Sequence, residues 1–144
     1  MDEIAPNFSN GIMVVPGMPE SDDSNDSGFF YPASTMAVVK VLREQGYSVR
    51  VATDEVRELS YHAADLWLPI LEIGRDLLVG AGGNLLAALI VLLIDSKQNV
   101  RAHVKWRVTA PDGTVQTFKY DGDREGAIRA AELFEASLRP DEER

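Results

Sequence analysis

The chain has 144 residues, a formal net charge of −9 and no cysteine. This length suits a single domain with a substantial hydrophobic core. The lack of cysteine excludes disulfides and thiol chemistry, which is compatible with a reducing cytoplasm. The negative charge disfavours nonspecific binding to nucleic acid or to anionic membranes. The amino-terminal residues show no basic segment followed by an apolar stretch, so we expect no secretory signal and a cytoplasmic protein.

The first predicted element is a short apolar strand, residues 11–15, bounded by polar residues and a proline. Residues 16–28 are acidic, rich in turn formers and too poor in apolar side chains to fold alone, which predicts a flexible loop. Their aspartates lack the spacing, central glycine and closing glutamate of a calcium-binding loop, so we predict no metal site. We expect the aromatic residues 29–31 to anchor the return of this loop to the core.

A helix, a glycine and a strand follow. Ser34 or Thr35 is expected to cap a helix that runs to Gln45, and Gly46 ends it. Residues 47–53 then alternate between apolar and polar side chains, which is typical of a strand.

Residues 54–59 are polar and predict a turn or a single helical turn. Residues 64–73 have two interpretations: a strand interrupted by Pro69, or the first part of a helical hairpin that ends at Gly80. The helix is favoured by apolar residues spaced three to four apart, which are Leu66, Ile70, Ile73 and Leu77.

The uncharged run 77–94 concentrates more apolar surface than any other segment. As a helix it would be about 27 Å long, close to the roughly 30 Å of a bilayer core, so a single-span membrane-associated protein is one alternative. Its glycines each weaken a helix by about 1 kcal/mol, which leaves 84–96 as the strong helix. Its flanks show no one-sided excess of lysine and arginine. We therefore predict a core helix buried between a sheet and other helices.

The start of this helix offers a second alternative, a small-molecule or nucleotide-binding domain. Free N–H groups at a helix N-terminus favour anions, and the residues of this possible anion-binding turn are Gly80, Gly82, Gly83 and Asn84. A complete dinucleotide or P-loop motif is missing.

Residues 100–120 predict a β-hairpin around the turn Ala110 to Thr114. If Ala110 pairs with Thr114, any two opposite residues have numbers that sum to 224. One side of the hairpin is then apolar and is expected to cover the core helix. Its pairs are Val104 with Tyr120, Trp106 with Phe118, and Val108 with Gln116.

The opposite side of the hairpin is basic, and Arg50 is expected beside it on a neighbouring strand. The candidate partner-binding residues are Arg101, His103, Lys105, Arg107, Lys119 and Arg50. Acidic side chains of adjacent elements or of the 16–28 loop would neutralise this face in one interpretation. In the other it binds an anionic partner. An acidic protein is favoured over nucleic acid because outward aromatic platforms are missing.

A last helix is expected from a cap at Asp121 or Asp123 through Leu138, with Glu132 and Glu135 on its outward side. Its inward stripe is Ile128, Ala131, Phe134 and Leu138. Residues 140–144 are expected to form a solvated tail.

The two histidines, His62 and His103, have no metal-ligand spacing. Ser60, His62 and Asp65 include the residue types of a catalytic triad without a motif that would place a nucleophile. We therefore predict no metal, no cofactor and no enzymatic activity.

Residues 65–138 resemble the effector-associated constant component family of small bacterial domains. The resemblance lies in the Leu/Ala-rich helix opened by Gly80 to Asn84, the strand Val104 to Val108, the turn from Ala110 to Gly113, and the closing strand and helix. It implies an adaptor or regulatory module of a bacterial defence or signalling system, and it supplies no catalytic residues.

The sequence thus predicts one α+β domain over residues 1–139. We expect a two-layer sandwich with a mixed sheet of about four or five strands, including the hairpin 100–120, and about three main helices mostly on one face. The predicted function is a non-enzymatic protein-interaction module that binds an acidic partner through the basic sheet face. Self-association into a homo-oligomer is a further possibility.

Overall fold

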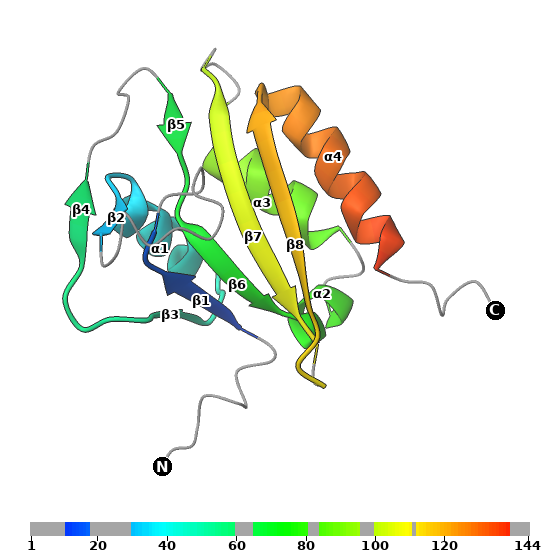
Figure 1. Cartoon of the computed structure of the whole chain (residues 1–144), viewed down its shortest axis with the longest axis horizontal. Helices are drawn as coiled ribbons and strands as arrows, with labels where there is room; N and C mark the ends of the chain where they lie inside the picture. The colour runs from blue at the N-terminus through cyan, green and yellow to red at the C-terminus, as the bar shows by residue number, and fades with distance from the viewer. Residues whose placement is uncertain are drawn as a thin grey trace.

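The computed structural model describes residues 11–17, 30–59, 65–80, 84–95, 100–110 and 112–138. They form an α+β fold with a C-terminal hairpin, as predicted (Figure 1). The elements in chain order are β1 (Ile12–Val15), β2 (Phe30–Pro32), α1 (Thr35–Glu44), β3 (Val49–Val51), β4 (Arg57–Leu59), β5 (Leu66–Trp67), β6 (Ile70–Gly74), α2 (Arg75–Gly80), α3 (Leu85–Leu93), β7 (Ala102–Thr109), β8 (Val115–Gly122) and α4 (Arg124–Ser137).

Six strands form one mixed sheet, and β2 and β4 form a separate parallel pair. The order across the large sheet is β3, β1, β6, β7, with β8 on the far side of β7. Strands β5 and β6 both pair in parallel with β7, β5 with its first residues and β6 with its last. They therefore occupy one strand position, interrupted between Trp67 and Ile70.

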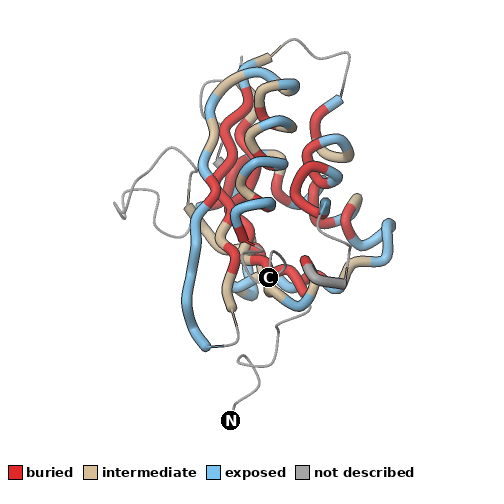
Figure 2. Tube along the Cα trace, turned by 90° about the vertical axis from the view of Figure 1, so that its right-hand side faces the viewer, coloured by how far each residue is buried: buried red, intermediate tan, exposed pale blue. Residues whose placement is uncertain are grey.

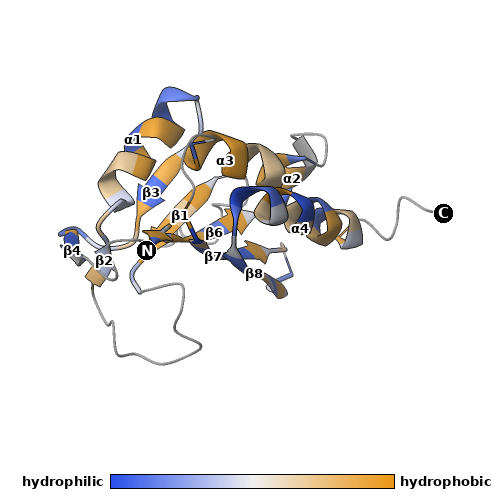
Figure 3. Ribbon diagram, turned by 90° about the horizontal axis from the view of Figure 1, so that it is seen from above, coloured by the Kyte–Doolittle hydropathy of each residue, from blue (hydrophilic) through white to orange (hydrophobic). Residues whose placement is uncertain are grey.

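The described helices lie on one face of this sheet (Figures 2 and 3). Two parallel connections explain this arrangement, because β1 reaches β3 through α1 and β6 reaches β7 through α2 and α3. The connections move in opposite directions across the sheet, and their strands also run in opposite directions. A right-handed crossover changes face when either its direction across the sheet or the direction of its strands is reversed. Because both are reversed here, the helices of the two connections lie on the same face. The other face, called the open face below, carries no helix of the described residues.

The helical interpretation of residues 64–73 was wrong, because residues 66–67 and 70–74 are strands. Leu71 and Ile73 are fully buried and face the helices. This strand lies between β1 and β7 and is buried nearly continuously, so its apolar pattern resembles that of a buried helix. Pro69 lies at the interruption, where it removes no N–H from a ladder.

Residues 57–59 also differ from the prediction of a turn, because they form β4 and pair with β2. The expected cap at Ser34 is different too. Ser34 is the N-cap residue of α1, but its hydroxyl makes no capping hydrogen bond and donates instead to the carbonyl of Trp67 at 2.8 Å. The hydroxyl of Thr35 donates to the carbonyl of Pro32 at 2.7 Å. Both bonds tie the start of α1 to strands, and Gly46 ends the helix at a φ of 97° as expected.

The hairpin is confirmed in its turn and in its register. All eight pairs of β7 with β8 sum to 224, including Trp106 with Phe118. Gly113 has a φ of 94° and donates its N–H to the carbonyl of Ala110 at 2.9 Å. Trp106 is fully buried and Phe118 is 3% exposed, so this side of the hairpin covers the core as predicted.

The core helix α3 ends at Leu93, and residue 96, its predicted end, lies outside the described residues. The buried residues of α3 and the position after it are Leu85, Leu86, Ala87, Leu89, Ile90 and Ile94. Leu92 and Leu93 are partly buried at the rim of the core. Within the described part of the chain, we find no helix that combines the length and apolar character needed to cross a bilayer.

Candidate functional site

The predicted basic residues of the open face lie on three strands, and those of β7 and β8 are neighbours, whereas β1 and β6 separate them from Arg50. His103, Lys105 and Arg107 alternate along β7 with the buried core residues, Lys119 is paired with Lys105 on β8, and Arg50 is on β3 at the opposite side of the sheet. Arg101 directly precedes β7.

These cations differ in their exposure. Arg50, Arg101 and Lys119 are exposed, whereas His103 and Lys105 are each only 8% exposed. The side chain of Arg107 is 31% exposed and forms an ion pair with Glu72 of β6 at 3.2 Å. A partner can therefore reach fewer of these basic side chains than the sequence predicted.

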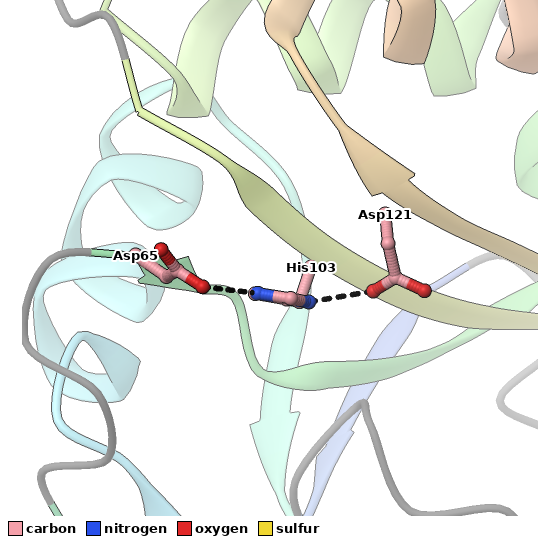
Figure 4. A network of polar contacts seen from close by, with 3 residues as sticks. All are labelled: Asp65, His103 and Asp121. Atoms are coloured by element: carbon pink, nitrogen blue, oxygen red, sulfur yellow. Dashed lines mark hydrogen bonds and ion pairs between the residues drawn. The ribbon is translucent and has the colours of Figure 1, made fainter.

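His103 is held between two carboxylates (Figure 4). Its Nε2 lies 2.8 Å from Oδ2 of Asp65, which directly precedes β5, and its Nδ1 lies 2.6 Å from Oδ1 of Asp121 on β8. The ring also stacks on Trp67, with ring centroids 3.7 Å apart and planes 11° apart. Three neighbouring segments of the sheet are thereby joined through one imidazole.

This network makes His103 a structural residue of the open face. Both ring nitrogens are engaged, so neither can bind a substrate or a metal without losing a contact to a carboxylate. The two carboxylates also cancel the positive charge that an imidazolium would add to the face. The described residues contain no cluster of three or more potential ligands that could hold a metal ion.

A carboxylate of the chain itself, that of Glu135, lies at the helix N-terminus that follows the predicted anion-binding turn. Gly82 and Gly83 lie outside the described residues, and Asn84 is exposed at the start of α3. The next two backbone N–H groups, of Leu85 and Leu86, donate to the carboxylate of Glu135 at 2.8 and 2.9 Å. Glu135 is 1% exposed. The carboxylate therefore holds two of the donors that a phosphate at this helix N-terminus would use.

The outward orientation expected for Glu135 was wrong for this reason. Helical periodicity places it beside Glu132, but α3 packs against α4 with its N-terminus next to the last turn of α4. The partial positive charge of that N-terminus stabilises a carboxylate. At the C-termini of α3 and α4, where the partial charge is negative, arginine side chains donate to the backbone. Arg124 donates to the carbonyl of Ile94 at 2.8 Å, just after α3, and Arg75 donates to the carbonyl of Leu138, just after α4.

The predicted hairpin register, in which opposite residues sum to 224, placed His103 opposite Asp121, but the sequence did not indicate the contacts of Asp65, Trp67 and Glu135. One signal was present for Glu135, because a carboxylate in the last turn of a helix is unfavourable for that helix. Such a residue is expected to have a favourable partner elsewhere. Asp65 gave no comparable signal, because its role depends on the parallel pairing of β5 with β7.

A scan against protein-family models, a search of curated proteins and a search of solved structures each gave no match. The resemblance to the effector-associated constant component family stays a prediction.

Proposed function

We propose that this domain is a non-enzymatic protein-interaction module that binds an acidic protein segment on the open face of its sheet. The observation that carries the proposal is the charge of that face. Among the described residues, four lysines and arginines on the strands of that face, and Arg101 directly before β7, stand against three carboxylates, with the histidine counted as neutral. The cations are Arg50, Arg101, Lys105, Arg107 and Lys119, and the carboxylates are Asp65, Glu72 and Asp121.

This surplus is located on a chain whose total formal charge is −9. A positive patch on a negative protein orients an acidic partner toward one face and repels it from the others. Two of the three exposed cations, Arg50 and Arg101, are arginines. An arginine side chain can bind a carboxylate with two parallel hydrogen bonds. The geometry therefore favours recognition of carboxylate side chains over that of a bulk negative surface.

The nucleotide-binding alternative has less support. A phosphate at the start of α3 would have to compete with the buried Glu135 carboxylate for the N–H groups of Leu85 and Leu86. Displacing a buried carboxylate from its hydrogen bonds costs several kcal/mol.

A selection from a random peptide library tests the proposal. We expect bound peptides to be enriched in aspartate and glutamate, and their affinity to fall as salt is added. Arg50→Glu and Arg101→Glu should each weaken binding at least about fivefold. Arg129→Glu, an equal charge change at an exposed position of α4, is the matched control. Selected peptides without an acidic bias, or equal effects of all three variants, would contradict the proposal.

A further inference from the structure

The contacts of Asp65, His103 and Asp121, called the His103 network below, require a definite number of protons (Figure 4). Nδ1 of the ring lies 2.6 Å from a carboxylate oxygen of Asp121, and Nε2 lies 2.8 Å from one of Asp65. A ring nitrogen and a carboxylate oxygen are both acceptors unless one of them carries a proton. The two contacts therefore need two protons, whereas a neutral imidazole between two ionised carboxylates supplies one.

Loss of one of these protons to water leaves a nitrogen lone pair facing a carboxylate, so one of the two contacts has to open. The contact to Asp121 is the shorter one, and β8, which carries Asp121, is paired with β7 along its whole length. Asp65 precedes the two-residue strand β5, which is paired with β7 at those two residues. The contact to Asp65 has the weaker support, and we expect it to open first.

A released Asp65 carboxylate lies close to an exposed cation of the open face. Leu66 is paired in parallel with Ala102, so the residues before them, Asp65 and Arg101, are neighbours across the same two segments. The N–H of Leu66 donates to the carbonyl of Arg101 at 2.9 Å. The released carboxylate therefore competes with an acidic partner for the guanidinium of Arg101.

The other charged groups around the ring are cations. Among the described residues of β5, β7 and β8, Asp121 is the one carboxylate, and Asp65 directly precedes β5. The cations beside His103 on the same face are Arg101 and Lys105, two positions before and after it, and Lys119, two positions before Asp121. Of all these residue types, histidine is the one that ordinarily changes its charge between about pH 5 and 8.

We infer that the His103 network makes binding at the open face sensitive to pH. With two protons the network is closed, the ring adds a positive charge to the face, and Asp65 is kept away from Arg101. With one proton this charge is lost and the Asp65 carboxylate is released toward Arg101. The face then holds an acidic segment less tightly, so binding weakens as the pH rises. This inference rests on the proposed function, because it describes the regulation of the same surface.

The affinity of the full chain for a peptide of about ten aspartates, measured from about pH 5.5 to about pH 8.5, tests the inference. Aspartate has an ordinary pKa of about 3.9, so the charge of the peptide is constant over this range. We expect the affinity to fall about threefold or more as the pH rises. His103→Gln removes the titrating ring and should reduce this change to less than about 1.5-fold.

Asp65→Asn tests which carboxylate is released, at a side chain that is 29% exposed. The amide can accept from the ring or donate to it, so the contact persists and no carboxylate is released. The pH dependence of binding should then be weaker than in the original chain. Glu72→Gln is the matched control, because Glu72 is a carboxylate of the same face that pairs with Arg107, and it should keep the full pH dependence.

NMR of the chain without peptide separates this inference from the proposed function. The nitrogen-15 shifts of the ring show which nitrogens carry protons, and the signals missing from His103→Gln identify those of His103 among the two histidines. We expect Nε2 to lose its proton as the pH rises, together with a change at the carboxyl carbon of Asp65.

The outcomes are distinct. If these signals change together but no peptide binds at any pH, the proposed function is wrong and the regulation with it. Binding that does not depend on pH would overturn this inference alone. So would a pH dependence that persists in His103→Gln, or a ring that loses its proton without any change at Asp65.

Discussion

The carboxylate of Glu135 joins the last turn of α4 to the first turn of α3, and its removal provides a sharp test of how these helices are held. We consider Glu135→Gln, which keeps the length and one oxygen, and Glu135→Ala, which removes the acceptor. Glu132→Gln is the matched control, because Glu132 is exposed on the same helix.

The structure gives the expected magnitudes. Glu135 is 1% exposed and accepts two backbone N–H bonds, at 2.8 and 2.9 Å. Removing the carboxylate leaves the two buried N–H groups of Leu85 and Leu86 without an acceptor, which costs about 1–3 kcal/mol for each. Glu135→Ala should therefore lower the free energy of unfolding by about 2–6 kcal/mol. Glu135→Gln retains one acceptor and should cost about 1–3 kcal/mol, whereas Glu132→Gln should stay within about 0.5 kcal/mol of the original chain.

Urea unfolding followed by tryptophan fluorescence measures these differences, because Trp106 and Trp67 are both buried and report on the core. With a slope of about 1–3 kcal/mol per molar urea, Glu135→Gln should shift the midpoint by about 1 M. Hydrogen exchange should show faster exchange of the Leu85 and Leu86 amides in that variant. A Glu135→Ala variant as stable as Glu132→Gln, or unchanged protection of those two amides, would show that the carboxylate does not hold the two helices together.

Three other predictions concern titration and the histidine network. Hydrogen bonds from the Thr114 side chain and then from its backbone N–H lower the pKa of Asp112 below 3.8. The stability that these bonds give is present above pH 3.8 and is lost as the pH falls through the lowered pKa. Carboxyl NMR should show the lowered pKa, and a pKa at or above 3.8 would contradict the prediction. Burial, and after it the hydrogen bond to Asp123, raises the pKa of Tyr120 above 10.0. The contribution of this side chain to stability is therefore complete below pH 10.0 and is lost as the pH rises through the raised pKa. In an ultraviolet titration, the tyrosine that ionises at this higher pH should be missing from Tyr120→Phe. His103→Phe keeps an aromatic ring against Trp67 but loses both contacts to the carboxylates. It should lower the free energy of unfolding, measured by urea titration, by about 1–3 kcal/mol. An unchanged urea midpoint would show that the histidine network does not stabilise the sheet.

The elements that could be predicted are those specified by neighbouring residues. The turn from Ala110 to Thr114 sets the register of the hairpin by itself, so the burial of Trp106 followed from the sequence. The apolar run of α3 is specified in the same local way. Residues 66–74 could not be assigned, because their strand character comes from pairing with β7, about 35 residues later in the chain. Periodicity does not distinguish a strand buried in this way from a buried helix.

The candidate site shows the same division. Alternation along the hairpin placed His103, Lys105 and Arg107 on one face, as the structure has them. It did not show that Asp65 approaches His103 from β5, or that Glu72 approaches Arg107 from β6. Both carboxylates come from strands whose pairing partners could not be predicted, so the charge of the face was overestimated.

An NMR titration of the isotopically labelled chain with a synthetic peptide of about ten glutamates shows directly whether the open face is the binding surface. We expect salt-sensitive shifts of the backbone amides near Arg50, Arg101 and Lys119, with little change along α3 and α4. A glutamine peptide of equal length should produce none of these shifts. Shifts concentrated on the helical layer, or no response to the glutamate peptide at low salt, would contradict the assignment of the open face as the binding surface.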